Sequence, residues 1–285
     1  MTLLAATDGS DFSQRVIRYS ATLAAALSSP LDVCCVIDYI SAGFLTQSAV
    51  TGAPDLLRDG ASRTLDNAVK ICESRNVVAR THLLEGSVAP EILRCSLKVG
   101  AHYIVMGTHG RGGLRAALFG STAYRVIQTT HVPVIVVAEN FRDQEARMFK
   151  HVVVGVDGSA AGRRAALAAF DLARQISANV YLCHVVDLQS TVASELHDAQ
   201  TKGDMLLDAE ASRGLQFGIN ASKHILRGNA SDQLWNFAQT HEADLIALGT
   251  HGRHGLARTL LGSVAEEVIR SSDIPVLIVG DNQEG

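Results

Sequence analysis

One glycine-rich stretch occurs twice in this chain, and its residue types are suited to holding a phosphate. In both copies the spacing is glycine, two residues, glycine, nine residues and Gly-Ser. The copies are Gly107-Thr108-His109-Gly110-Arg111 with Gly120-Ser121, and Gly249-Thr250-His251-Gly252-Arg253 with Gly262-Ser263. Glycines let the backbone approach a phosphate, and a serine at a helix start offers a hydroxyl and an N–H group. The pattern therefore predicts two phosphate cradles.

The segments around each copy should position it as strand, glycine loop and helix start. Apolar runs precede the copies at Tyr103–Met106 and Leu245–Leu248, and helix-like segments follow at Ala123–Thr130 and Ala265–Ser272. A helix start presents unpaired N–H groups and the positive end of the helix dipole, which attract an anion.

The whole chain is an internal duplication. Asp8-Gly9-Ser10 recurs as Asp157-Gly158-Ser159, and Val36-Ile37-Asp38 is matched by Val185-Val186-Asp187. We expect one domain at 1–139, a charge-rich linker at 140–150 and a second domain at 151–285. The first half has extra residues between its second and third strands.

Each half alternates short apolar runs with helix-period segments, which predicts βαβ units and a mostly parallel sheet covered on both faces. In the first half we expect strands at Leu3–Thr7, Asp32–Ile37, Val77–Leu83, Tyr103–Met106 and Val134–Ala138, and helices at Ser13–Ser28, through Leu65 and Cys72, and at Pro90–Val99.

Two familiar phosphate motifs do not fit. The turn after the first strand is Asp-Gly-Ser rather than GxGxxG, and neither half has the Gly-Lys-Ser/Thr of a P-loop. The glycine loop instead follows the fourth strand. Open α/β sheets bind ligands at the carboxyl ends of strands, where the winding direction reverses. Strands one and four would flank that point, which would bring Asp8 and Asp157 beside the glycine loops.

With these motifs together, both halves resemble universal stress protein domains of the ATP-binding type. The resemblance rests on Asp-Gly-Ser, the spaced glycine loop, and Val-Pro-Val or Ile-Pro-Val before the last strand. It implies two tandem Rossmann-like (HUP-type) α/β domains, each a five-stranded parallel sheet of order 3-2-1-4-5 with helices on both faces. It also implies an internal pseudo-dimer through Val134–Ala138 and Val276–Gly280, and allows a homodimer.

The resemblance also implies a ligand, ATP or ADP with or without Mg²⁺, and the residues that hold it. Asp8 and Asp157 match the acid on the ribose and adenine side, and Val36 and Val185 match the residue whose backbone reads the adenine edge. The phosphate and ribose cradles are matched by Gly107, His109, Gly110, Gly120, Ser121 and Thr122, and by Gly249, His251, Gly252, Gly262, Ser263 and Val264.

Simpler roles stay open for several of these residues. The glycines would also suit a purely structural turn, and Asp-Gly-Ser is good turn chemistry. Arg111 and Arg253 suit either the phosphates or solvent. The halves differ at Thr122 and Val264, at Gly112 and His254, and at His102 and Asp244. None of these differences breaks the glycine spacing, so both sites are expected to be competent. His82 and His224 are interpreted as a feature of the fold.

Length, charge and cysteine pattern limit the classes of protein to which this chain is expected to belong. A chain of 285 residues favours two domains, and a net charge of −4 gives no indication of nucleic-acid binding. We expect no membrane association, and an N-terminus without a basic region favours a cytoplasmic protein. The five cysteines form no CxxC and are expected to be buried, reduced thiols, with a redox role for Cys34-Cys35 as the alternative. No cluster has metal-ligand spacing.

The leading hypothesis is a nucleotide-binding regulatory protein of a stress response. Phosphoryl transfer needs a positioned nucleophile and charge stabilisation. The loops offer phosphate-binding groups without an evident base or carboxylate pair, so no catalytic residue is assigned and weak ATP hydrolysis is the most that is expected. A slow ATPase or other nucleotide-converting enzyme, and an interaction scaffold without nucleotide, are the alternatives.

Overall fold

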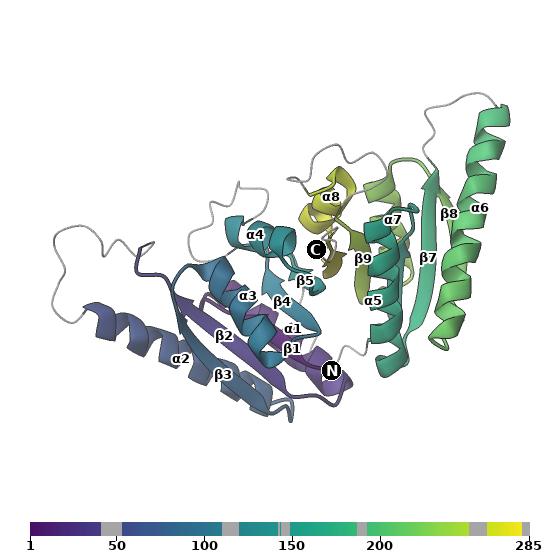
Figure 1. The fold of residues 1–285 in the computed structure, drawn as a ribbon. Coiled ribbons are helices and arrows are strands. Elements are labelled where there is room, and N and C mark those ends of the chain that lie inside the picture. Colours follow the sequence, from purple (N-terminus) through teal and green to yellow (C-terminus); the bar gives the residue numbers. More distant parts are fainter. Residues whose placement is uncertain are drawn as a thin grey trace. The chain divides into compact units, whose positions relative to one another are not determined.

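A computed structural model describes residues 1–40, 53–109, 120–141, 143, 149–186, 193–250 and 261–280. The chain divides into two compact units, the first made of residues 1–126 and 143–145 and the second of residues 127–142 and 146–285. Each unit is an α/β structure, as the alternating pattern of the sequence predicts (Figure 1).

In the first repeat, helices and strands alternate along the chain. They are β1 (Leu3–Ala6), α1 (Asp11–Ala26), β2 (Leu31–Ile37), α2 (Ala53–Glu73), β3 (Ala79–Glu85), α3 (Val88–Val99), β4 (Tyr103–Gly107), α4 (Ser121–Thr129) and β5 (Val134–Val137). The strands of the first unit lie in the order β3-β2-β1-β4, and β1 with β2, β1 with β4, and β2 with β3 pair in parallel. Helices α1 and α2 pack together on one face and α3 covers the other (Figure 1).

The second repeat has the same sequence of elements. They are β6 (His151–Gly155), α5 (Ala160–Ile176), β7 (Asn179–Val186), α6 (Ala193–Gln216), β8 (Ser222–Arg227), α7 (Ala230–Thr240), β9 (Leu245–Gly249), α8 (Ser263–Ser271) and β10 (Val276–Val279). Its strands lie in the order β8-β7-β6-β9-β10 and are parallel. This is the 3-2-1-4-5 order that the family resemblance implies.

Strand β5 of the first repeat belongs to the second unit, where it pairs with β10 in antiparallel orientation. The register places Ile135 opposite Leu277, and both side chains are fully buried. Every residue of both strands is buried, which is the continuous apolar pattern of strands covered on both faces. The pairing removes an exposed edge from each strand.

Local capping explains where α1 begins. The sequence predicts a start at Ser13, whereas the helix starts at Asp11 because the Ser10 hydroxyl accepts the N–H of Ser13 at 3.1 Å. In α3, Pro90 lies in the first turn, as predicted, since no helical partner is lost there. Strand β3 runs from Ala79 to Glu85 rather than from Val77 to Leu83, in register with the whole of β2.

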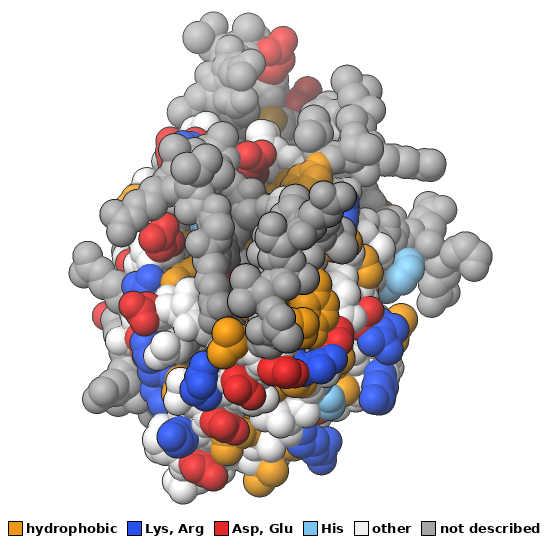
Figure 2. All heavy atoms as spheres, turned by 90° about the vertical axis from the view of Figure 1, so that its left-hand side faces the viewer, with side chains coloured by type: hydrophobic (Ala, Val, Ile, Leu, Met, Phe, Trp, Pro, Cys, Tyr) orange, Lys and Arg blue, Asp and Glu red, His pale blue; other side chains and the backbone are white. Residues whose placement is uncertain are grey.

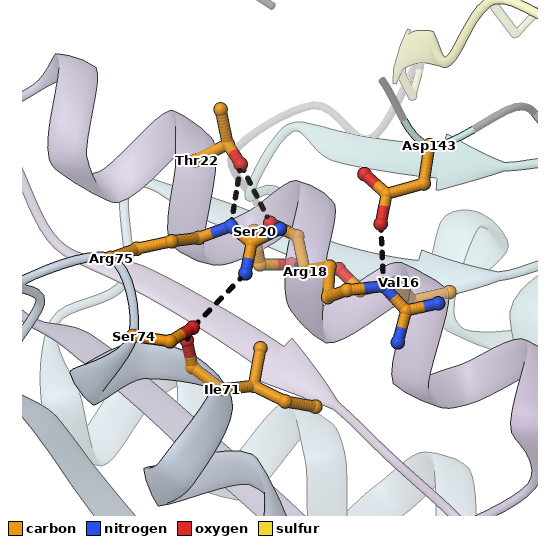
Figure 3. A network of polar contacts seen from close by, with 8 residues as sticks. All are labelled: Val16, Arg18, Ser20, Thr22, Ile71, Ser74, Arg75 and Asp143. Atoms are coloured by element: carbon orange, nitrogen blue, oxygen red, sulfur yellow. Dashed lines mark hydrogen bonds and ion pairs between the residues drawn. The ribbon is translucent and has the colours of Figure 1, made fainter. Parts of the chain in front are cut away.

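Residues from the segment expected to be the linker contact α1. The guanidinium Nε of Arg18 donates to Asp143 over 2.5 Å (Figure 3). On the same helix, the Thr22 hydroxyl donates to the carbonyl of Arg18 and accepts from Arg75 at the end of α2 (Figure 3). Arg18 and Thr22 thus connect α1 to two segments that are distant in the sequence.

Candidate functional site

The predicted site residues of the first repeat lie at one edge of its sheet. Strand β1 pairs in parallel with β2 on one side and with β4 on the other. The carboxyl ends of these strands therefore place Asp8, Val36 and Gly107 along the edge where the winding direction reverses. In the second repeat β6 pairs with β7 and β9, which gives Asp157, Val185 and Gly249 the same arrangement. Val36 and Val185 are both partly exposed.

The Asp-Gly-Ser turn has one hydrogen-bond network in both repeats. Oδ1 of Asp8 accepts from the N–H and the hydroxyl of Ser10 at 3.0 and 2.7 Å. Oδ1 of Asp157 accepts from the same groups of Ser159 at 2.9 and 2.8 Å. Each serine in turn caps the following helix. The aspartates therefore have the structural role that the sequence left open beside a ligand role.

The glycine inside this turn is required by its backbone conformation. Gly9 and Gly158 have φ angles of 81° and 80°, in the left-handed region that side chains with a Cβ rarely adopt. The turn directs the chain from the strand end straight into α1 or α5.

The two ends of each glycine loop are joined by a backbone hydrogen bond. Gly120 donates its N–H to the carbonyl of Thr108 over 2.7 Å, and Gly262 donates to Thr250 over 2.5 Å. A Cβ on Gly120 would lie 2.3 Å from the Thr108 oxygen, so a larger residue does not fit. Thr108 and Thr250, which the sequence analysis did not assign, are buried and hold these junctions. Both threonines occupy the same position in the two glycine motifs, and this recurrence is the sequence signal that could have identified them.

Each junction leads directly into a helix whose first residue is the predicted serine. Ser121 begins α4 and Ser263 begins α8, and both are exposed. Gly262 is the N-cap of α8 and provides no side-chain hydrogen bond. The first N–H groups of α8 thus have no cap from that residue, which suits an anion at the helix start. Thr122 and Val264 follow the serines and are half-buried.

Part of each cradle lies outside the described residues. This concerns Gly110, Arg111 and Gly112 in the first repeat, and His251, Gly252, Arg253 and His254 in the second. Of the two motif histidines, His109 is described, and its Nδ1 lies 2.9 Å from the Thr108 hydroxyl. That contact orients the imidazole at the start of the loop.

The difference between His102 and Asp244 does not concern the candidate sites. Nδ1 of His102 accepts the N–H of Thr2 at 3.1 Å, and Asp244 accepts the N–H groups of Lys150 and His151 at 2.6 and 2.9 Å. Both side chains accept hydrogen bonds from backbone N–H groups at the start of the first strand of their repeat. They lie at the amino ends of β4 and β9, opposite the glycine loops.

Comparison with known proteins identifies the family. The model of the universal stress protein family matches residues 1–138 and again residues 148–280. The chain belongs to the universal stress protein family. A universal stress protein from Mycolicibacterium smegmatis is 27% identical to this chain, and the alignment covers 97% of this chain and 96% of that protein. Universal stress protein Rv2623 from Mycobacterium tuberculosis is 25% identical, with 98% and 96% coverage.

A solved structure of a universal stress protein agrees in fold with this chain. The crystal structure of one from Archaeoglobus fulgidus superposes with a TM-score of 0.72 at 23% identity, covering 99% of this chain and 98% of its own. At this identity the likeness concerns the fold. Another universal stress protein, solved in complex with cAMP, is 30% identical over 47% of this chain and 98% of its own, with a TM-score of 0.41.

The described surface and helices of this universal stress protein carry mixed charge and lack the features of a membrane-spanning helix or a metal cluster. On the face in Figure 2, acidic and basic side chains are interspersed. Among the described residues, no helix is long and apolar enough to cross a membrane. Within those same residues, no group of three or more His, Cys, Asp or Glu side chains is arranged to hold a metal ion.

Proposed function

We propose that this universal stress protein binds ATP or ADP, one nucleotide in each repeat, and that occupancy regulates its action in a stress response. The observation that carries the proposal is the junction of Gly120 with Thr108, repeated at Gly262 and Thr250. Each junction closes a glycine loop and places a serine-led helix start at the carboxyl edge of the sheet, where α/β proteins bind phosphorylated ligands.

The residues fit a nucleoside phosphate by their chemistry. In this proposal the helix starts at Ser121 and Ser263 hold the phosphates with N–H and hydroxyl donors, together with the loop glycines. Asp8 and Asp157 face the ribose side, and the backbone of Val36 and Val185 reads the adenine edge. These donors would form hydrogen bonds to the negatively charged phosphate oxygens of the nucleotide, and Mg²⁺ would accompany the phosphates.

The proposed role is regulatory rather than catalytic. Hydrolysis of a bound nucleotide requires a group that positions water and a group that stabilises the developing charge. In the described part of the first loop, His109 is engaged with the Thr108 hydroxyl. Slow ATP hydrolysis is the second candidate, and steady-state phosphate release above background that is lost in glycine-loop variants would favour it.

The proposal extends to the assembly. The antiparallel pairing of β5 with β10 supports an internal pseudo-dimer of the two repeats, joined through their last strands. We propose that this chain works in the cytoplasm with nucleotide as its small-molecule partner and without nucleic acid or membrane as partners. A homodimer of the whole chain is compatible with this arrangement.

Two measurements test the nucleotide proposal. Mass spectrometry of small molecules released from the purified protein should find an adenine nucleotide. Calorimetry with ATP, ADP, AMP and cAMP should give two sites per chain for the preferred ligand. Gly110→Val and Gly252→Val should each remove one site, because the new side chain would occupy phosphate space. Absence of bound and titratable nucleotide would overturn the proposal, and unchanged stoichiometry in both variants would overturn the site assignment.

A further inference from the structure

Four side chains that the nucleotide site does not use meet on the α3 side of β2. Asp32 and Cys34 are two residues apart on this strand and so share a face. His82 on β3 lies opposite Cys34 in the sheet register, and Cys95 reaches the same place from α3. Asp32, Cys34 and Cys95 are 1%, 1% and 3% exposed. These four residues are called the thiol cluster below.

An ion pair and a thiol pair make up the cluster. Nε2 of His82 lies 2.7 Å from Oδ1 of Asp32, while the buried Oδ2 of Asp32 has no hydrogen-bond partner. The thiols of Cys34 and Cys95 are hydrogen-bonded to each other. Helix α3 packs on β2, and two neighbouring thiols held in this way can be oxidised to a disulfide.

The two thiols differ in acidity. The hydrogen bond from Cys34, helped by His82 and Lys98, lowers the pKa of Cys95 to about 7 against the opposing effects of burial and of Asp32. The same contact, together with burial, raises the pKa of Cys34 well above its ordinary value. Of the two thiols, Cys95 is therefore the more readily ionised. The thiolate is the form of cysteine that reacts as a nucleophile.

The second repeat shows that the fold does not require this cluster. Cys183 lies opposite His224 in the register of β7 and β8, as Cys34 lies opposite His82. Tyr181 occupies the position of Asp32 in the second repeat. Phe237 occupies the position of Cys95, because Phe237 follows Gly228 by as many residues as Cys95 follows Gly86. His224 instead packs on Phe237 with ring centroids 4.7 Å apart. The histidine is present in both repeats, whereas the carboxylate and the second thiol occur in the first.

We propose that Cys95 and Cys34 form a peroxide-reactive dithiol that closes to a reversible disulfide. The Cys95 thiolate attacks one oxygen of hydrogen peroxide and the O–O bond breaks. The leaving hydroxide takes a proton to form water, and Cys95 becomes a sulfenic acid. The Cys34 sulfur then attacks the Cys95 sulfur. An S–S bond forms, the S–O bond breaks, and the thiol proton of Cys34 leaves with the hydroxide as a second water. The two thiols lose two electrons and the peroxide gains them.

All five cysteines are buried, and the lowered pKa of Cys95 sets its pair with Cys34 apart from the others. Burial raises the pKa of Cys72 to about 11 and that of Cys183 to about 12, so both stay protonated near neutral pH.

Cys35, the neighbour of Cys34 in the chain, points to the opposite face of β2. The sequence alternative of a Cys34-Cys35 redox pair is therefore replaced by Cys34 with Cys95. The side chain of His82 is 22% exposed, so the cluster lies close to the surface, and the proposal requires hydrogen peroxide to reach the thiols beside this histidine.

Peptide mapping of the full chain tests the proposal. The reduced protein is treated with one to ten equivalents of hydrogen peroxide, free thiols are alkylated in denaturant, and tryptic peptides are analysed by mass spectrometry. The expected product is a Cys34–Cys95-linked peptide that dithiothreitol converts back to free thiols, with Cys72 and Cys183 still alkylated. No linked peptide at any ratio, or oxidation of Cys183 as fast as Cys95, overturns the proposal.

Variants separate the two steps. Cys34→Ser keeps a hydrogen-bond donor beside Cys95 and should abolish the disulfide while leaving Cys95 as a sulfenic acid that dimedone labels, whereas Cys95→Ala should abolish both products. His82→Gln should slow disulfide formation at pH 7 roughly three- to tenfold and move its pH profile upward, because the thiolate fraction falls. His224→Gln is the matched control and should leave the rate unchanged. Equal rates in all proteins would refute the role of the cluster, and the mapping of the unmodified chain decides the matter if a variant does not fold.

Discussion

The N–H group of Gly120 donates to the carbonyl oxygen of Thr108 over 2.7 Å, and this bond brings the two ends of the first glycine loop together. The same bond joins Gly262 to Thr250 in the second repeat. A loop closed in this way positions its helix start by backbone geometry alone, since neither partner uses its side chain. Because this junction occurs in both repeats, the two candidate nucleotide sites share the same backbone frame.

Gly120→Ala should disrupt the first junction. The added Cβ would lie 2.3 Å from the Thr108 oxygen, so the loop must shift, at a cost of about 1–3 kcal/mol in the free energy of unfolding. Calorimetry should then find one nucleotide site per chain instead of two. Gly60→Ala in α2 is the control, because nothing lies within 4 Å of the new Cβ, and it should stabilise by about 0.5–1 kcal/mol. Two intact sites in Gly120→Ala would contradict the assigned cradle.

Asp157→Asn and Asp157→Ala should separate the turn role of Asp157 from its proposed ligand role. Asparagine keeps an oxygen that can accept from Ser159, so urea unfolding should resemble that of the unmodified chain. Alanine removes the acceptor and should destabilise by about 1 kcal/mol. Nucleotide affinity should fall in both variants. If Asp157→Asn binds with full affinity, the carboxylate serves the turn and not the ligand.

His224 should make the second repeat sensitive to acid. Burial, and to a lesser extent the nearby His241, lower the pKa of His224 in the folded state. The unfolded chain then binds more protons, so stability is lost as the pH falls through the unfolded value of about 6.5 and is restored as the pH rises. Urea unfolding at pH 7.5 and 5.5 measures this loss. His224→Gln should lose less stability between these two pH values; an identical loss would show that other groups are responsible.

Ile135→Ala in the first repeat should weaken the second unit. Its side chain is fully buried opposite Leu277, and truncation of such a residue costs about 2–5 kcal/mol. Hydrogen exchange should show faster exchange in β10 and β9 than in β1 and β2. Leu97→Ala, at a residue that is 78% exposed, should change stability by less than about 0.5 kcal/mol. Uniformly faster exchange throughout the chain would contradict a local effect of β5.

Much of the fold was predictable because its signals are local. Alternating apolar runs and helix-period segments predict βαβ units and a mostly parallel sheet, and the family resemblance implies the strand order found in the second repeat. The turns at Gly9 and Gly158 were predictable for the same reason, since a left-handed backbone angle selects glycine. The start of α1 at Asp11 was missed because the Ser10 cap acts through one side-chain bond.

The sequence by itself determined the duplication, the α/β class, the family resemblance and the residue types at the carboxyl edge, because each follows from the order of residues along the chain. The tertiary structure alone decided which distant side chains meet. It joined Thr108 to Gly120, assigned β5 to the second unit and brought Cys95 to Cys34 beside the His82–Asp32 pair. These contacts depend on strand register and helix packing, through which residues far apart in sequence become neighbours.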